Sequence, residues 1–163
     1  MTIHTLLIGY VVLTRLAELF IARRNTRRLL AMGGYEVGSG HYPLIVLLHV
    51  AWIIALIVLV PTQTPPAIHF LALFMVIQVT RYWVISSLGG RWTTRIIVVP
   101  GSSLVTKGPY RWLRHPNYLV VVSEIVLLPL VFGAWEIAVG FSVVNAMLLS
   151  YRIRIENAAL ANP

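Results

Sequence analysis

Residues 118–151 read YLVVVSEIVLLPLVFGAWEIAVGFSVVNAMLLSY, a long apolar stretch with Pro129 and Gly133 near its centre. A helix needs about 20 mainly apolar residues to cross a hydrocarbon core of about 30 Å, so this stretch is too long for one crossing. Proline cannot continue a helix and glycine allows a sharp turn. The stretch therefore predicts two membrane helices joined as a tight hairpin.

Three further apolar runs of membrane-spanning length precede this hairpin: Ile3–Ala22, Pro43–Val60 and Ala67–Leu88. The composition agrees, because 58% of the residues are hydrophobic and only 11% are charged, against roughly 25% charged residues in a soluble domain. The sequence predicts an all-α polytopic membrane protein with about five transmembrane helices, the last two forming the hairpin. With no linker-like segment, residues 1–163 are expected to form a single integral membrane domain.

The net charge of +8 has a one-sided distribution. All Lys and Arg residues other than Arg15 and Arg81 follow the first, third or fifth run. Such residues favour the cytoplasmic side, so a five-span arrangement places them, and the C-terminus, on the cytoplasmic face. No nucleic-acid partner is predicted, because these residues flank apolar runs and do not form one basic soluble face. No metal site is predicted either: the chain has no cysteine, and His41 and His49 lack a nearby carboxylate.

Two arginines fall within the predicted spans, where an unpaired ion is costly. Arg15 and Glu18 are three residues apart, so we expect a structural ion pair on one helix face. Arg81 precedes the end of its run by one or two turns, and we expect its side chain to extend toward the interface. Neither arginine is assigned a catalytic role.

The segment from Gly89 to Tyr118 is rich in Arg, Gly, Pro and aromatic residues and contains no run of spanning length. Its centre reads KGPYRWLRHPNY, residues 107–118. Pro116 suits the first turn of the following helix, which places His115 at the helix entrance, where backbone N–H groups can bind an anion. This segment is predicted to be a cytoplasmic loop that can enclose a polar ligand.

A second polar cluster, YRIRIEN, occupies residues 151–157. Arg152 and Glu156 are four residues apart and share a helix face. If the hairpin returns to the cytoplasmic side, this end can close over the loop and form one pocket within about residues 89–163. A plainer interpretation is that the rings and cations are interfacial anchors and that Arg152 and Glu156 only stabilise the helix.

The core G-x-Y-x-x-x-R-H-P-x-Y, residues 108–118, followed by an apolar hairpin and RIRIE, residues 152–156, resembles the isoprenylcysteine carboxyl methyltransferase family. These are membrane enzymes that use S-adenosylmethionine (SAM). Upstream, residues 40–43 (GHYP) and 91–95 (RWTTR) resemble a short bacterial branch, some members of which methylate alkylpyrone or alkylresorcinol lipids. The resemblance implies a protein of the bacterial inner membrane with a cytoplasmic active site.

The resemblance also implies roles for individual residues. Arg152 would hold and orient the methyl acceptor, and Glu156 would close the pocket, so both are the expected catalytic residues. The family commonly has two adjacent acidic residues where this chain has Glu156 and Asn157. The expected SAM-binding set is Arg95, Leu104, Val105, Gly108, Tyr110, Arg114, His115, Asn117, Tyr118 and Glu156.

The expected acceptor is a lipophilic or prenylated molecule that reaches the site from the membrane lipids. A carboxylate acceptor is already ionised and needs only positioning, whereas a phenol or enol needs a base, for which Glu156 and His115 are candidates. Two other functions remain open. Sterol-reductase-type NADPH-dependent membrane reductases share the R-H-P-x-Y region. A non-catalytic transporter or assembly subunit would carry ionisable residues deep in a span, and the clustering of polar residues at one face counts against transport.

Overall fold

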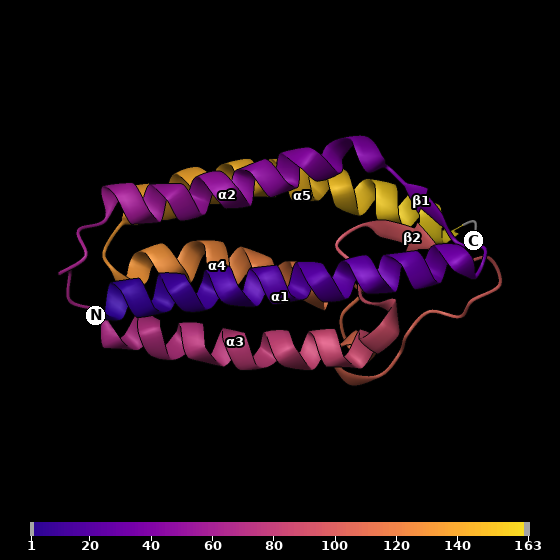
Figure 1. Cartoon of the computed structure of the whole chain (residues 1–163), viewed down its shortest axis with the longest axis horizontal. Helices are drawn as coiled ribbons and strands as arrows, with labels where there is room; N and C mark the ends of the chain where they lie inside the picture. The colour runs from indigo at the N-terminus through magenta and orange to yellow at the C-terminus, as the bar shows by residue number, and fades with distance from the viewer. Residues whose placement is uncertain (1, 162–163) are drawn as a thin grey trace.

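The computed structural model describes residues 2–161, in which five α-helices run roughly side by side (Figure 1). α1, α2, α3 and α5 are each long and apolar enough to cross a membrane, and α4 is apolar but shorter. This confirms the predicted all-α polytopic membrane fold. The helices are α1 (Ile3–Ala31), α2 (Tyr42–Leu59), α3 (Ile68–Leu88), α4 (Pro116–Val131) and α5 (Trp135–Ala161).

The predicted hairpin is formed by α4 and α5. α4 contains Pro129 in its last turn and ends at Val131, and α5 begins at Trp135. Gly133 adopts a positive φ of 68° in the turn, a conformation that costs glycine little because it has no Cβ. The backbone N–H of Ala67 donates to the carbonyl of Val131 at 2.8 Å, so the segment before α3 is fixed to this turn.

The helices differ in length from the predicted spans, and these differences create the site. α1 continues past Ala22 to Ala31, and α5 continues past Tyr151 to Ala161, since Arg, Leu and Ala are good helix formers beyond the apolar run. α4 has only 16 residues, or about 24 Å of helix. α1 and α5 therefore extend beyond the first turn of α4, and residues 89–115 occupy the space that remains (Figure 1).

A small sheet at this end was not predicted. β1 (Tyr35–Val37) pairs antiparallel with β2 (Ile96–Val98), with Tyr35 opposite Val98 and Val37 opposite Ile96. Strands of three residues are too short to show a periodic pattern in the sequence. The Nδ2 of Asn25 in α1 also donates to the carbonyl of Trp92 at 2.8 Å. The sheet and this bond attach the segment before α2 and the end of α1 to residues 89–115, which include η2 (Gly89–Arg91) and η3 (Gly108–Arg111).

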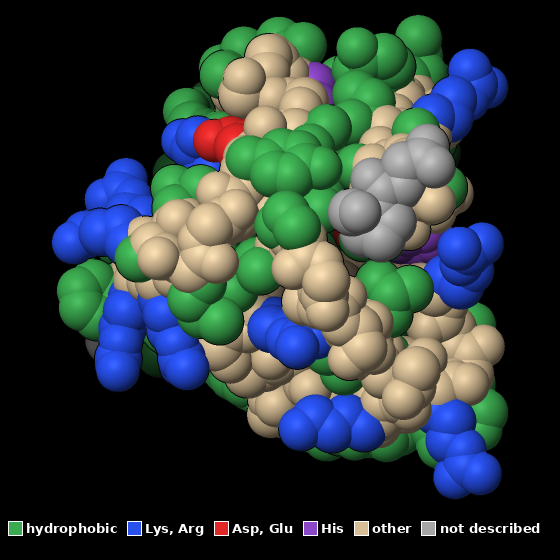
Figure 2. All heavy atoms as spheres, turned by 90° about the vertical axis from the view of Figure 1, so that its right-hand side faces the viewer, with side chains coloured by type: hydrophobic (Ala, Val, Ile, Leu, Met, Phe, Trp, Pro, Cys, Tyr) green, Lys and Arg blue, Asp and Glu red, His purple; other side chains and the backbone are tan. Residues whose placement is uncertain are grey.

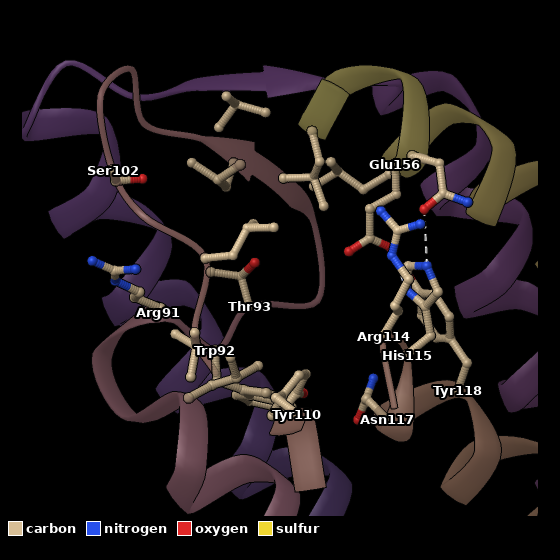
Figure 3. A pocket seen from close by; sticks show the side chains of 18 of the residues that line it. Arg91, Trp92, Thr93, Ser102, Tyr110, Arg114, His115, Asn117, Tyr118 and Glu156 are labelled. Carbon is tan, nitrogen blue, oxygen red and sulfur yellow. Dashed lines mark hydrogen bonds and ion pairs between the residues drawn. The ribbon is translucent and has the colours of Figure 1, made fainter. Parts of the chain in front are cut away.

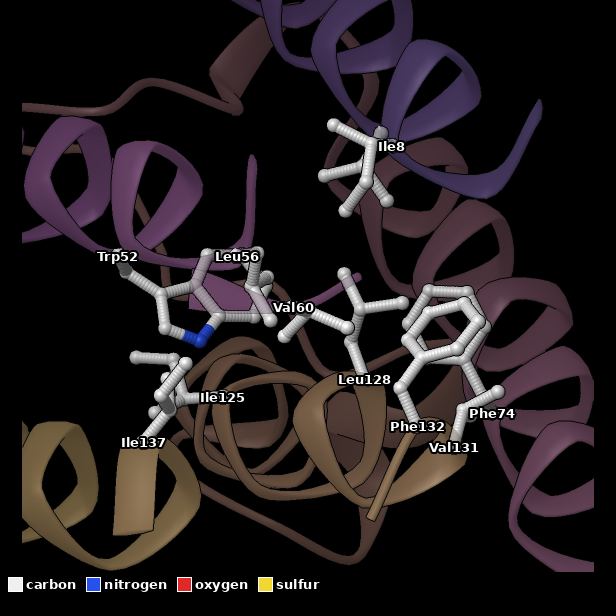
Figure 4. Close-up of a cluster of buried hydrophobic side chains, with 11 residues drawn as sticks. Ile8, Trp52, Leu56, Val60, Phe74, Ile125, Leu128, Val131, Phe132 and Ile137 are labelled. Carbon is white, nitrogen blue, oxygen red and sulfur yellow. The ribbon is translucent and has the colours of Figure 1, made fainter. Parts of the chain in front are cut away.

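The hydrophobic core lies among all five helices (Figure 4). Leu56, Phe74 and Leu128 have no exposed surface, and each comes from a different helix. Large apolar side chains such as Phe20 (72% exposed) and Val58 (70% exposed) instead cover the outside of the helices. Contiguous apolar surface of this kind marks contact with lipid. The core cluster comprises Ile8, Val11, Trp52, Leu56, Val60, Phe74, Ile125, Leu128, Val131, Phe132 and Ile137.

A buried ionic cluster joins α1, α3 and α4. Arg81 donates to both carboxylate oxygens of Glu18 at 2.6 Å and to Glu124 at 2.8 Å. Arg15 donates to Glu18 at 2.7 Å, as predicted, and to Glu124 at 2.8 Å. Gln78 donates to Glu124 at 2.7 Å. The charges of the two arginines and the two glutamates therefore balance, and each charged group is also hydrogen-bonded. Buried charges are stable only when both conditions are met.

The prediction that the Arg81 side chain extends toward the interface is wrong. The residue is only 6% exposed, because Glu18 and Glu124 lie beside it and offer its guanidinium a partner inside the bundle. The argument against a transporter, that the polar residues cluster at one face, is also wrong, since ionisable residues do lie within the helices. Glu124 was overlooked in the sequence, although a single acidic residue inside an apolar run is itself a signal of a buried polar contact.

The end of the molecule that carries the long tails of α1 and α5 is strongly basic. Figure 2 views this end and shows several groups of Lys and Arg side chains around the face, with little acidic surface beside them. At the opposite end, the segments 60–67 and 132–136 contain no Lys or Arg. The predicted separation of charge along the bundle is therefore present in the fold.

Replacing Glu124 with Ala should destabilise the protein by about 3–5 kcal/mol, because Arg15 and Arg81 would keep their burial and lose a shared anion. Denaturant unfolding in detergent micelles measures the change. Glu136→Ala, at the exposed start of α5, is the matched control and should have little effect. Equal stability of the two variants would contradict the structural role of the cluster.

Candidate functional site

The site is built around the start of α4. His115 immediately precedes α4, and Pro116 occupies its first turn, as predicted. η3 lies just upstream and begins at Gly108, whose φ is +59°. A Cβ on Gly108 would lie 2.1 Å from Ser87 Oγ, so only glycine allows η3 to pack on the end of α3. This packing holds Tyr110 over the space in front of α4.

A cavity of about 420 Å³ lies between this segment and the last turns of α5. Figure 3 shows Trp92 and Tyr110 on one side of it, and Glu156 with His115 and Tyr118 on the other. Gly108 was expected to bind SAM but does not line the cavity. Its close packing against Ser87 explains why a glycine occupies this position. All the other expected site residues line it together: Arg95, Leu104, Val105, Tyr110, Arg114, His115, Asn117, Tyr118, Arg152 and Glu156.

Tyr118 connects the two halves of the site. Its hydroxyl donates to the Glu156 carboxylate and accepts a hydrogen bond from Arg152 Nε at 2.8 Å. Arg152 Nη2 also donates to the carbonyl of Thr94 at 2.9 Å. The end of α5 therefore folds onto the 89–118 segment, as predicted. Within residues 2–161 Arg152 and Glu156 form no direct ion pair, because each binds Tyr118 instead.

His115 is held by the same turn of α5. Its ring stacks on Tyr118 with the centroids 5.2 Å apart, and its Nε2 lies 3.0 Å from Oδ1 of Asn157. Its Nδ1 is 3.7 Å from the Glu156 carboxylate. Asn157 stands where the family commonly has a second acidic residue. Its contact with His115 fixes the ring that lies beside Glu156.

The cavity wall places charged side chains of both signs close to uncharged aromatic rings. Burial, and then the negative charge of Glu156, raise the pKa of the Tyr110 phenol above its usual range, so this side chain is a neutral aromatic wall at physiological pH. Arg95 pairs with Glu36 at 2.7 Å and lies over the Tyr42 ring at 4.7 Å. Glu36 and Tyr42 were not among the expected site residues, and neither lies in the R-H-P-x-Y motif.

Two polar atoms of the cavity wall have no hydrogen-bond partner among the described residues. They are the Nε1 of Trp92, a donor, and the Oδ1 of Asn117, an acceptor, and both are buried. A buried polar atom without a partner costs about 1–3 kcal/mol. A ligand that both accepts and donates hydrogen bonds would satisfy these atoms. Trp92 was missed as a lining residue, although it belongs to the RWTTR stretch.

Comparison with known proteins agrees with this arrangement. The model of the isoprenylcysteine carboxyl methyltransferase (ICMT) family matches residues 70–162, which include nearly all of α3, the cavity segment, the hairpin and the end of α5. This chain belongs to that family. Membership supports a membrane methyltransferase.

Two curated relatives are similar to this chain over almost all of its length. The uncharacterized protein YpbQ of Bacillus subtilis (strain 168) is 43% identical over 159 residues, covering 95% of each chain. An uncharacterized protein of Haemophilus influenzae is 26% identical over 156 residues, covering 91% of this chain and 89% of that one. No solved structure matches significantly. The similarity to YpbQ therefore extends to α1, α2 and β1, upstream of the region that the family model matches.

Replacing Tyr118 with Phe should loosen the last turns of α5, because Arg152 and Glu156 would both lose the hydroxyl that joins them. The expected cost is about 1–3 kcal/mol of local stability, seen as faster amide hydrogen exchange in residues 152–161. Tyr151→Phe removes an exposed hydroxyl from the same helix and serves as control. Unchanged exchange in the Tyr118 variant would show that this hydroxyl does not hold the helix end.

Proposed function

We propose that this protein is a SAM-dependent O-methyltransferase that acts on a lipophilic acceptor at the cytoplasmic face of the bacterial inner membrane. The observation that carries the proposal is the single cavity enclosed by the R-H-P-x-Y motif and the end of α5, joined through Tyr118. Membership of the ICMT family supplies the reaction class.

The residues present fit SAM. The unpartnered Trp92 donor and Asn117 acceptor match a ligand that carries a carboxylate, an ammonium group and ribose hydroxyls. Arg114 can pair with a carboxylate, and the neutral ring of Tyr110 can face a cation. When bound, SAM supplies an electrophilic methyl group on a positively charged sulfur.

The task of the protein in such a reaction is to align the acceptor oxygen and to exclude water. Arg152 is suited to hold that oxygen, because Tyr118 and Thr94 fix its Nε and Nη2 and its Nη1 has no hydrogen-bond partner among the described residues. Glu156 closes the cavity between Tyr118 and His115. The rigid placement of these groups keeps the orienting cation in one position.

A lipophilic acceptor follows from where the cavity lies. It lies at the end of a bundle whose outer surface is apolar, so an acceptor with a hydrocarbon tail could remain in the lipid while its head group enters the cavity. The basic end of the bundle supports the cytoplasmic assignment, because Lys and Arg near span ends favour that side. The head group in this proposal is a carboxylate or a phenol or enol.

Transport by the buried ionic cluster is the less favoured alternative. A transport pathway needs ionisable groups that can exchange partners, whereas here Arg81 and Arg15 are each bound to both Glu18 and Glu124. The closed set of ion pairs favours a structural role in holding α1, α3 and α4 together.

Replacing Arg152 with Ala should reduce methyl transfer by at least about 10²-fold, because the acceptor oxygen would lose its orienting cation. SAM affinity should remain largely unchanged. Arg154→Ala, two residues along on an exposed position, is the matched control. Normal turnover of the native acceptor by the Arg152 variant would show that this arginine does not position the acceptor.

Calorimetric titration of the purified protein with SAM and with NADPH separates the proposal from a membrane reductase. We expect saturable binding of SAM and none of NADPH. The reverse result would replace methyl transfer with hydride transfer, and binding of neither would favour a non-catalytic role.

A further inference from the structure

Both candidate bases named from the sequence, Glu156 and His115, are bound to other side chains through one of their polar atoms. The Glu156 carboxylate accepts the Tyr118 hydroxyl and lies near His115 Nδ1, and the other ring nitrogen of His115 lies 3.0 Å from Asn157. A base must have a lone pair that can reach the proton it removes. Both groups already contact side chains that hold the end of α5 in place.

His41, in contrast, is a buried histidine whose ring makes no hydrogen bond among the described residues. It is 6% exposed, and both of its ring nitrogens are buried without a hydrogen-bond partner among residues 2–161. Leaving a buried polar side chain unpaired is costly, and it is uncommon in folded proteins. The packing of the bundle alone therefore does not explain why a histidine occupies this position.

The ring of His41 lies against the turn of α5 that carries Arg152. It meets the Tyr151 ring edge-on, with the centroids 5.8 Å apart. A Cβ built on Gly38 would lie 2.8 Å from His41 Cε1 and 2.9 Å from Ile155 Cγ2, so the histidine and Ile155 pack around one glycine. The charged groups that act on the ring are Arg152 and Glu36.

The backbone beside His41 forms a short and lightly packed turn at the surface. η1 (Ser39–His41) is a single short turn preceded by Gly38, which has a φ of +66°. Ser39 and Gly40 are exposed, and a Cβ on Gly40 would meet nothing within 4 Å. β1 and the Glu36–Arg95 ion pair anchor the chain upstream of this turn. Movement of η1 would thus give access between His41 and Arg152 without disturbing the sheet.

We propose that the acceptor oxygen binds between Arg152 Nη1 and the ring of His41, and that His41 is the general base for a neutral hydroxyl acceptor. This inference rests on the proposed methyltransferase function. As the acceptor O–H bond breaks, its proton passes to a ring nitrogen of His41. The oxygen electron pair forms the O–CH₃ bond while the S–CH₃ bond of SAM breaks and its electrons remain on sulfur, giving a neutral thioether. The imidazolium then returns its proton to water.

The assignment selects a class of acceptor. A carboxylate needs no base at neutral pH, whereas a phenol with a pKa of about 10 does. A buried base beside an orienting cation is therefore suited to a long-chain phenol, whose anion Arg152 would also stabilise. On this account His41, with Arg152, forms the acceptor side of the site, and the R-H-P-x-Y motif forms the cofactor side.

The test uses an alkyl nitrophenol with a long chain, whose phenolate absorbs visible light, bound to the purified full chain without SAM. We expect wild type to ionise the bound phenol, and His41→Gln and His41→Asn to leave it protonated. His49→Gln is the matched control, because His49 bonds only to the backbone of its own helix among the described residues. SAM affinity, measured on every variant, reports whether the cofactor side is intact.

Turnover supplies the second readout. With an alkylresorcinol as acceptor, the His41 variants should lose about 10²- to 10⁴-fold in kcat, and with a long-chain carboxylate acceptor they should lose far less, because that acceptor needs no base. Three results would overturn the role of His41 and leave the proposed function standing. They are a wild type that binds the nitrophenol without ionising it, His41 variants that still ionise it, and a wild type that methylates carboxylates alone. Failure of wild type to bind SAM would instead overturn the proposed function itself.

Discussion

The hydroxyl of Tyr118 joins two parts of the chain that are more than thirty residues apart, accepting from Arg152 and donating to Glu156. Tyr118 lies in the first turn of α4, and both partners lie near the end of α5. This contact determines where α5 ends relative to the 89–118 segment, and therefore whether a cavity exists. Arg152 and Glu156 each bind Tyr118 and form no ion pair with each other, although their helix spacing would permit one.

The contact depends in turn on the placement of α4, which is too short to cross the bilayer unaided. The ionic cluster fixes it: Glu124, in the middle of α4, binds Arg15 of α1 and Arg81 of α3. Charges in a low-dielectric bundle are stable only when every partner is present. One buried carboxylate thus helps to set the position of the helix that begins directly after His115 and carries Tyr118 in its first turn. It links packing within the bundle to the geometry of the site.

The sequence predicted those features whose signals are local. Apolar length predicted the helices, Pro129 and Gly133 predicted the hairpin, and the motif around Tyr110 and Tyr118 predicted several of the residues that line the cavity. Features that depend on tertiary contacts were not predictable in the same way. The burial of the Arg81 side chain depends on carboxylates in two other helices. The position of Glu36 depends on the pairing of two three-residue strands. His41 lies in the GHYP stretch, but the sequence assigned it no role, and only the burial of its unpaired nitrogens distinguishes it from the other histidines that were considered.

A structure of the protein in complex with S-adenosylhomocysteine, the product left after methyl transfer, tests the central claim most directly. The account predicts the ligand in the cavity between Trp92 and Glu156, in contact with both Tyr110 and the end of α5, with the Tyr118 contacts to Arg152 and Glu156 intact. A ligand bound elsewhere, or bound while the end of α5 is detached from Tyr118, would contradict it.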